Sequence, residues 1–150
     1  MRIAQIFSAA ITLLSVSPSY AEDLVTKSSP HTVAMTMDKL VTAVEGAGAK
    51  VFARVDHAAG AVSVGMELRP TQLLIFGNPK LGTPALQASQ TSGLDLPLRV
   101  VIYRDKNDKV LLAYHNPSEL SKDHGIPADA EVLKKMAEAL DKLTNKAVSQ

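Results

Sequence analysis

The chain contains no cysteine among its 150 residues. This absence excludes disulfides, thiol nucleophiles, iron–sulfur clusters and thiolate zinc sites together. The net charge is close to zero, because the chain has 16 basic and 15 acidic residues. The chain therefore lacks the excess of basic residues that nucleic-acid binding requires. The chain does have 46% hydrophobic residues, enough for one ordinary core without disulfide support.

The common catalytic signatures are missing as well. The sequence has no Gly-x-Ser-x-Gly, no Gly-x-Gly-x-x-Gly, no phosphate loop and no His-Glu-x-x-His. Gly46-Ala47-Gly48 follows a helical pattern and is typical of a helix end. None of the four histidines lies three or four residues from another, so no helical metal pair exists. The sequence therefore predicts no metal site and indicates no particular cofactor.

The first 21 residues resemble a secretory signal. Arg2 precedes a mostly apolar run over residues 3–16, and small residues lead up to Ala21. The run is shorter than the roughly 20 residues that span a bilayer, which argues against a membrane anchor. We expect cleavage between Ala21 and Glu22 and a periplasmic mature protein. Residues 22–150 then have the length of a single domain.

Hydrophobic periodicity in the mature chain predicts an α+β domain with an antiparallel sheet of four or five strands. Residues 98–103 and 110–114 flank a polar turn and form the strongest hairpin signal. Two principal helices are expected on one face of the sheet, over residues 33–47 and from residue 128 onward. Further strands are expected over residues 24–27, 50–56 and 73–76. Residues 58–65 could form a helical turn or a strand, and a short helix is favoured there. Another helix is expected from Pro84 to Thr91, with Pro84 in the first turn.

The first candidate site is the corner after the strand at residues 73–76. Asn78 offers an amide and Lys80 offers a positive charge. Together with Thr83 and free backbone amides near Pro84, they could hold an anionic group at a helix start. The structural alternative is that Asn78 forms a turn, Lys80 is solvated and Thr83 caps the helix.

The second candidate is Asp56-His57 at a strand end, because a carboxylate beside an imidazole can bind metal or move protons. A loop histidine with one ordinary hydrogen bond is the structural alternative. His57 and His115 could meet only if their strands were neighbours. Arg99 begins a strand and either faces a pocket or pairs with a carboxylate.

Four blocks of sequence carry a family resemblance: Val55-Asp56-His57, the run from Leu68 to Pro84 with its Phe-Gly-Asn-Pro-Lys centre, Leu94 to Val100 with Leu-Pro-Leu, and Tyr114-His115-Asn116-Pro117. On these residues the chain resembles the domain of unknown function 302 (DUF302) family. The resemblance implies a compact fold similar to the TATA-binding-protein-like β-α-β-sheet-α arrangement, and a homodimer. It implies no catalytic residues.

Three functional hypotheses follow from these observations. The first is a periplasmic binding or accessory module that holds a small anionic ligand near Asp56, His57, Asn78, Lys80, Thr83 and Arg99. The second is an enzyme in which Asp56 orients His57 as a general base. The third is a structural homodimer whose exposed apolar surface forms the interface.

Overall fold

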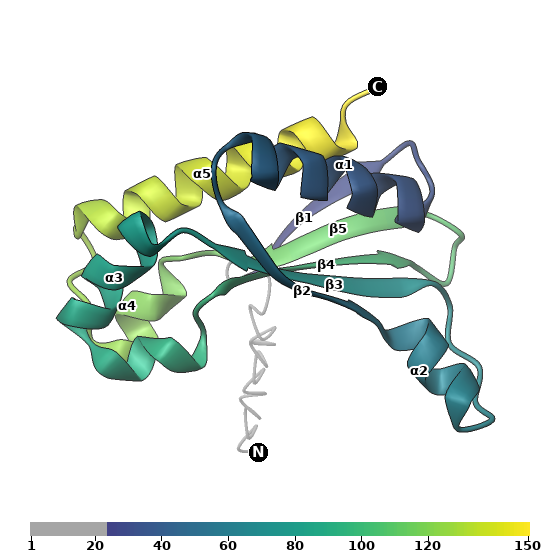
Figure 1. The fold of residues 1–150 in the computed structure, drawn as a ribbon, viewed down its shortest axis with the longest axis horizontal. Helices are drawn as coiled ribbons and strands as arrows, with labels where there is room; N and C mark the ends of the chain where they lie inside the picture. Colours follow the sequence, from purple (N-terminus) through teal and green to yellow (C-terminus); the bar gives the residue numbers. More distant parts are fainter. Residues whose placement is uncertain (1–23) are drawn as a thin grey trace, which may run out of the picture.

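The fold is a five-stranded antiparallel sheet with helices packed on one face, seen in a computed structural model that describes residues 24–150 (Figure 1). The signal-peptide prediction and its cleavage site lie outside these residues. The order of strands is β1-β5-β4-β3-β2, and every neighbouring pair is antiparallel. The strands are β1 Leu24–Ser29, β2 Lys50–Asp56, β3 Thr71–Gly77, β4 Leu98–Arg104 and β5 Val110–His115.

Two long helices, α1 (Val33–Gly46) and α5 (Glu131–Val148), lie side by side on one face of the sheet (Figure 1). Thr32 caps α1, because its side chain accepts a hydrogen bond from the backbone N–H of Met35. Gly48 lies in the turn after α1 with a φ of 72°, a left-handed conformation that suits glycine. The predicted fold class and the positions of both principal helices are thus confirmed.

The core lies between this helical pair and the sheet. Alternate strand residues, including Leu74, Phe76, Val100, Ile102 and Leu112, are buried on the helix side. They pack against α1 and α5, which contribute Met37, Leu40, Leu140 and Leu143 to the same cluster. Burial of an apolar side chain stabilises the fold by about 1.5–3 kcal/mol, so this layer supplies most of the driving force for folding.

The edge strand β1 is fixed to α5 by one side chain. The ammonium group of Lys27 donates hydrogen bonds to the Asp141 carboxylate at 2.7 Å, the Thr144 hydroxyl at 2.8 Å and the Asn145 amide oxygen at 2.7 Å. The ion pair and hydrogen bond from Lys27 lower the pKa of Asp141. The Lys27 side chain is 17% exposed, so its ammonium group is largely shielded from solvent while its N–H groups all have acceptors.

Four short helices occupy connections between the strands or between β5 and α5. They are α2 (His57–Ser63), α3 (Pro79–Ala88), the 3₁₀ helix η1 (Gln90–Leu94) and α4 (Glu119–His124). The short helix predicted near residues 58–65 is therefore confirmed. Figure 1 shows α2 projecting from one end of the sheet, while α3 and α4 lie at the other end.

Within residues 24–150, the second face of the sheet carries no long helix. Register places Leu73 opposite Val101 and Thr71 opposite Tyr103, and Tyr103 faces Leu111 in turn. These side chains point away from α1 and α5 and are only partly buried. At the α2 end, residues 62–70 are exposed throughout, and no residue of α2 is buried. The α2 segment thus forms an apolar projection beside a sheet face that none of the described helices covers; this face is called the uncovered sheet face below.

Candidate functional site

The corner at Asn78 joins the end of β3 to the start of α3. Asn78 is the N-cap: its Oδ1 accepts a hydrogen bond from the backbone N–H of Lys80 at 2.9 Å. Pro79 follows in the first helical turn, where its missing N–H costs nothing. The Asn78 Nδ2 donates to the carbonyl of Gly48 at 3.3 Å. Asn78 therefore links α3 to the turn after α1.

The helix begins earlier than the sequence analysis predicted. Pro84 lies inside α3 rather than in its first turn, and Thr83 is an interior helical residue rather than the cap. The sequence analysis assigned the cap to Thr83 because it took the whole Asn-Pro segment as a turn. Asn78 already satisfies a free backbone N–H, so the helix starts five residues sooner. Thr83 is therefore not at a helix start, and the free backbone N–H groups of this helix lie near its N-cap Asn78 rather than near Pro84.

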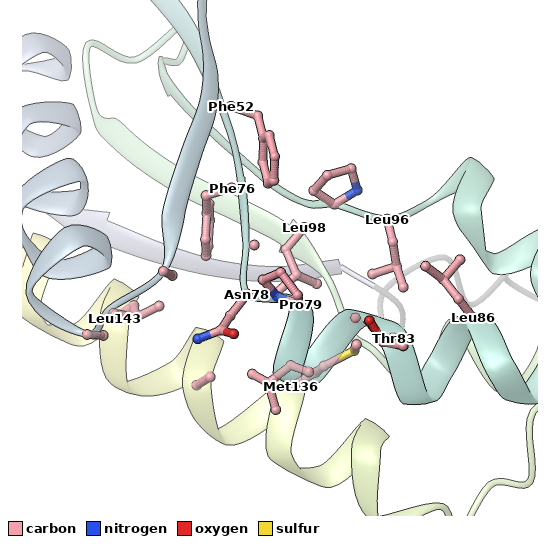
Figure 2. A pocket seen from close by; sticks show the side chains of 17 residues that line it. Phe52, Phe76, Asn78, Pro79, Thr83, Leu86, Leu96, Leu98, Met136 and Leu143 are labelled. Atoms are coloured by element: carbon pink, nitrogen blue, oxygen red, sulfur yellow. The ribbon is translucent and has the colours of Figure 1, made fainter.

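A cavity of about 320 Å³ opens beside this corner (Figure 2). Ligand pockets span about 300–1,000 Å³, so this volume suits a small molecule. Its wall comes from β2, β3, α3, α5 and the segment before β4, and it is overwhelmingly apolar. The lining side chains include Phe52, Phe76, Leu81, Leu86, Leu96, Pro97, Leu98, Met136, Ala139 and Leu143.

A β-bulge brings Phe52 to the cavity. The register between β2 and β3 shifts between Val51 and Ala53, so Phe52 is the extra residue. Its ring is 51% exposed and lines the cavity together with Phe76 (Figure 2). Gly77 lies against the same wall, because a Cβ there would be in van der Waals contact with Pro97 Cβ at 3.4 Å and with Phe52 Cε2 at 3.6 Å. Because of the bulge, Phe52 on the edge strand β2 forms part of the cavity wall.

Polar groups are few at this cavity. Asn78 and Thr83 line it, and the Thr83 hydroxyl points toward the space in Figure 2. Lys80 is exposed and is not a lining residue, although its backbone N–H bonds to Asn78. No side chain of Lys, Arg, His, Asp or Glu belongs to the described lining. The cavity can bind an apolar body and one neutral hydrogen-bonding group.

Asp56 and His57 lie at the opposite end of the sheet from Asn78. Asp56 pairs with Gln72, whereas Gly77 pairs with Lys50 at the other end of the same two strands. Asp56 caps α2 by accepting from the backbone N–H of Ala59 at 2.9 Å. This bond lowers the pKa of Asp56, and a further hydrogen bond from Gln72 acts in the same direction. The carboxylate is thus occupied by the backbone and by Gln72.

His57 is exposed and does not line any of the three best-formed cavities of residues 24–150. Strands β3 and β4 separate β2 from β5, so His57 and His115 do not meet. A general base needs a substrate-sized concavity and a partner that orients the ring. The Asp56–His57 arrangement offers neither, so the geometry gives no support to the general-base hypothesis.

Arg99 pairs with a carboxylate, which was one of its two expected roles. Its Nη2 donates to Asp95 Oδ1 at 2.8 Å and to the carbonyl of Leu94 at 3.0 Å. The other oxygen, Asp95 Oδ2, lies 2.7 Å from His124 Nε2, and His124 Nδ1 lies 3.1 Å from Thr91 Oγ1. The His124 side chain is only 6% exposed. This bridge joins β4, η1 and α4.

The sequence analysis missed both Phe52 and the Asp95–His124 contact. A regular strand over residues 50–56 alternates its side chains and has no extra residue, so the strand prediction alone could not indicate the bulge at Phe52. The Asp95–His124 pair spans 29 residues, and nothing local indicates it. Within residues 24–150, no group of three or more metal-ligating side chains is close enough to hold an ion.

Among the described residues, no helix combines the length and apolar character needed to cross a bilayer.

Comparisons with known proteins place the chain among relatives of known sequence and fold. The chain is 42% identical over 109 residues to proteins named fluoride-specific ion channel FluC 1 from Brucella suis biovar 1 and Brucella abortus biovar 1. The match covers 73% of this chain but only 43% and 40% of those proteins, so the chain spans less than half their length.

A solved structure shows the same fold. It is the crystal structure of an uncharacterized conserved protein DUF302 from Bacillus stearothermophilus, with a TM-score of 0.76 and 19% identity. The similarity covers 85% of this chain and 99% of that one. The family model described as domain of unknown function DUF302 matches residues 25–143. The resemblance found in the Phe-Gly-Asn-Pro-Lys and Leu-Pro-Leu blocks is thereby confirmed, and the chain belongs to the DUF302 family.

Proposed function

We propose that this protein is a periplasmic binding module that holds a small, mainly apolar molecule in the cavity beside Asn78. The observation that carries the proposal is the open apolar cavity itself. It collects aromatic and aliphatic side chains from elements far apart in sequence, and Phe52 is half exposed at its wall. Apolar concavities with a few placed polar groups are the usual form of small-molecule sites.

The proposal changes the kind of ligand expected at this corner. An anion needs a cation or several free backbone N–H groups nearby. Lys80 lies outside the lining, and its backbone N–H is already bonded to Asn78. The Asn78 amide and the Thr83 hydroxyl suit a neutral group such as a hydroxyl or carbonyl. We therefore favour an uncharged ligand with one polar end.

The names of the Brucella relatives make fluoride a second compound to test. The chain matches less than half of those proteins, and an apolar wall gives a small, strongly hydrated anion no partner to replace water. Fluoride binding at this cavity would therefore contradict the proposed ligand chemistry.

Thermal-shift and calorimetric titrations test the proposal. Benzyl alcohol and indole serve as apolar probes, and fluoride and phosphate serve as anions. Ala139 lines the cavity from α5, so Ala139→Leu should fill part of the space and abolish probe binding. Ala137 lies on the same helix outside the lining, so Ala137→Leu is the matched control and should bind normally. Probe binding that survives Ala139→Leu, or a response to anions alone, would overturn the proposal.

Self-association through the projecting segment at residues 57–70 is a second candidate role. Val62, Val64 and Met66 are 72%, 69% and 65% exposed, an apolar surface that monomeric proteins seldom leave open. The partly buried apolar residues of the uncovered sheet face lie beside it and extend this apolar surface. A second copy is the occupant we propose. A monomeric mass in light scattering up to high concentration would contradict it.

A further inference from the structure

A second cavity opens at the end of the sheet where β4 begins and β5 ends. Its volume is about 420 Å³. Leu96 and Leu98 separate it from the cavity beside Asn78, because they line both. Unlike that first cavity, it combines an apolar floor with charged groups of both signs. The role of these groups is not explained by the proposed function.

The floor is made of leucine side chains from four parts of the chain. Leu120 and Leu140 are almost completely buried, and Leu24 and Leu98 complete the apolar surface. An apolar floor of this kind excludes water from one side of a bound molecule, and this strengthens charge contacts at the rim. The site therefore suits a ligand with a short hydrocarbon part.

The basic side of the rim is held in place. Arg99 is fixed through Nη2 by Asp95, and Asp95 is itself held by His124. Because both Asp95 oxygens are engaged, Asp95 orients Arg99 and leaves the other guanidinium N–H groups available. Asn116 Oδ1 accepts from the backbone N–H of Ser118 at 3.0 Å, which leaves the Asn116 Nδ2 as a donor. His115 adds a third possible donor to the same lining.

The acidic side comes from α4. Glu119 and Asp123 both line the cavity and lie four residues apart, so they share one face of the helix. Like charges at this spacing repel and destabilise a helix. Glu119 is 18% exposed and contacts Lys122, while Asp123 makes no ion pair or hydrogen bond with residues 24–150. A bound cation would relieve this repulsion.

From this arrangement we infer that the second cavity binds a small zwitterionic amino acid with an apolar side chain. The ammonium group lies at Glu119 and Asp123, and the carboxylate lies at Arg99 and Asn116. The hydrocarbon side chain lies against Leu98, Leu120 and Leu140. A plain anion would meet the acidic side of the rim, and a plain amine would offer no acceptor to the remaining guanidinium N–H groups of Arg99. Only a ligand with both charges satisfies the whole rim.

Isothermal titration with L-leucine and two analogues tests the inference. Isoamylamine lacks the carboxylate, and 4-methylvalerate lacks the ammonium group. L-leucine should bind, and each analogue should bind at least ten-fold more weakly. Equal binding of either analogue, or no heat from L-leucine at millimolar concentration, would overturn the inference.

Variants locate the binding and separate the two cavities. Asp123→Asn should weaken L-leucine binding at least ten-fold, and Asp108→Asn, an exposed aspartate of the β4–β5 turn, should leave it unchanged. A melting temperature equal to that of the unmodified protein shows that Asp123→Asn still folds. Ala139→Leu fills the other cavity and should leave L-leucine binding intact. Loss of L-leucine binding in Ala139→Leu, or its persistence in Asp123→Asn, would refute the assignment.

Discussion

Replacement of Asn78 by alanine should destabilise the protein by about 1–2 kcal/mol. The loss of an N-cap side chain costs about 1 kcal/mol in typical helices. The Asn78 Nδ2 contact with Gly48 is long, at 3.3 Å, and adds about 0.5 kcal/mol. A domain of this size loses about 3–5 °C in melting temperature per kcal/mol. Urea denaturation and calorimetry of Asn78→Ala measure both quantities directly.

Two companion variants identify the cause of that loss. Asn78→Asp loses the donor to the Gly48 carbonyl, but it retains the oxygen that accepts from the Lys80 N–H and adds a charge that a helix N-terminus favours. These effects offset each other, so the variant should lose clearly less stability than Asn78→Ala. Lys80→Ala should change stability by less than about 0.5 kcal/mol, because only the backbone of Lys80 is engaged. If Asn78→Ala proves as stable as the unmodified protein, or Asn78→Asp loses as much as alanine, the capping role is refuted.

Three further outcomes are expected. Lys27→Met should destabilise by about 1–3 kcal/mol in urea denaturation, because it removes three hydrogen bonds between β1 and α5; unchanged stability would contradict this. Because the pKa of Asp141 is lowered in the folded state, its contribution is present above the usual value of about 4 and is lost as pH falls through the lowered pKa. Asp141→Asn should therefore show a shallower fall in urea midpoint below pH 4, and parallel curves would refute the assignment. Val62→Asp, at a side chain 72% exposed, should change stability by less than about 0.5 kcal/mol yet lower the mass measured by concentration-dependent light scattering; an unchanged mass would contradict self-association there.

The sheet and the long helices were predictable because their signals are periodic. Val33, Met37, Leu40 and Val44 recur at helical spacing, and three of them are completely buried in the structure. The β4–β5 hairpin was equally clear, because two strand-forming runs flank a polar turn. These features depend on neighbours along the chain, and sequence patterns report such neighbours well.

The site was less predictable because it depends on contacts between distant segments. The Asn-Pro corner was predicted as a candidate site, and the start of α3 was misplaced, because Asn78, Thr83 and Pro84 all carry helix-start signals. Competition between such signals is decided by which cap also fits its surroundings, and Asn78 alone reaches Gly48. The bulge at Phe52 and the composition of the cavity wall follow from strand pairing and packing, which no local pattern contains.

The projecting α2 segment is a place where the length of the chain can change during evolution. Asp56 and Gln72 are paired across β2 and β3, so the chain leaves the sheet and returns to it at adjacent positions. Doubling the length of such a connection costs only about 0.6 kcal/mol in loop-closure entropy. Insertions and deletions between these two residues should therefore be tolerated with both cavities intact, which makes this tip the natural place for sequence length to vary among homologues.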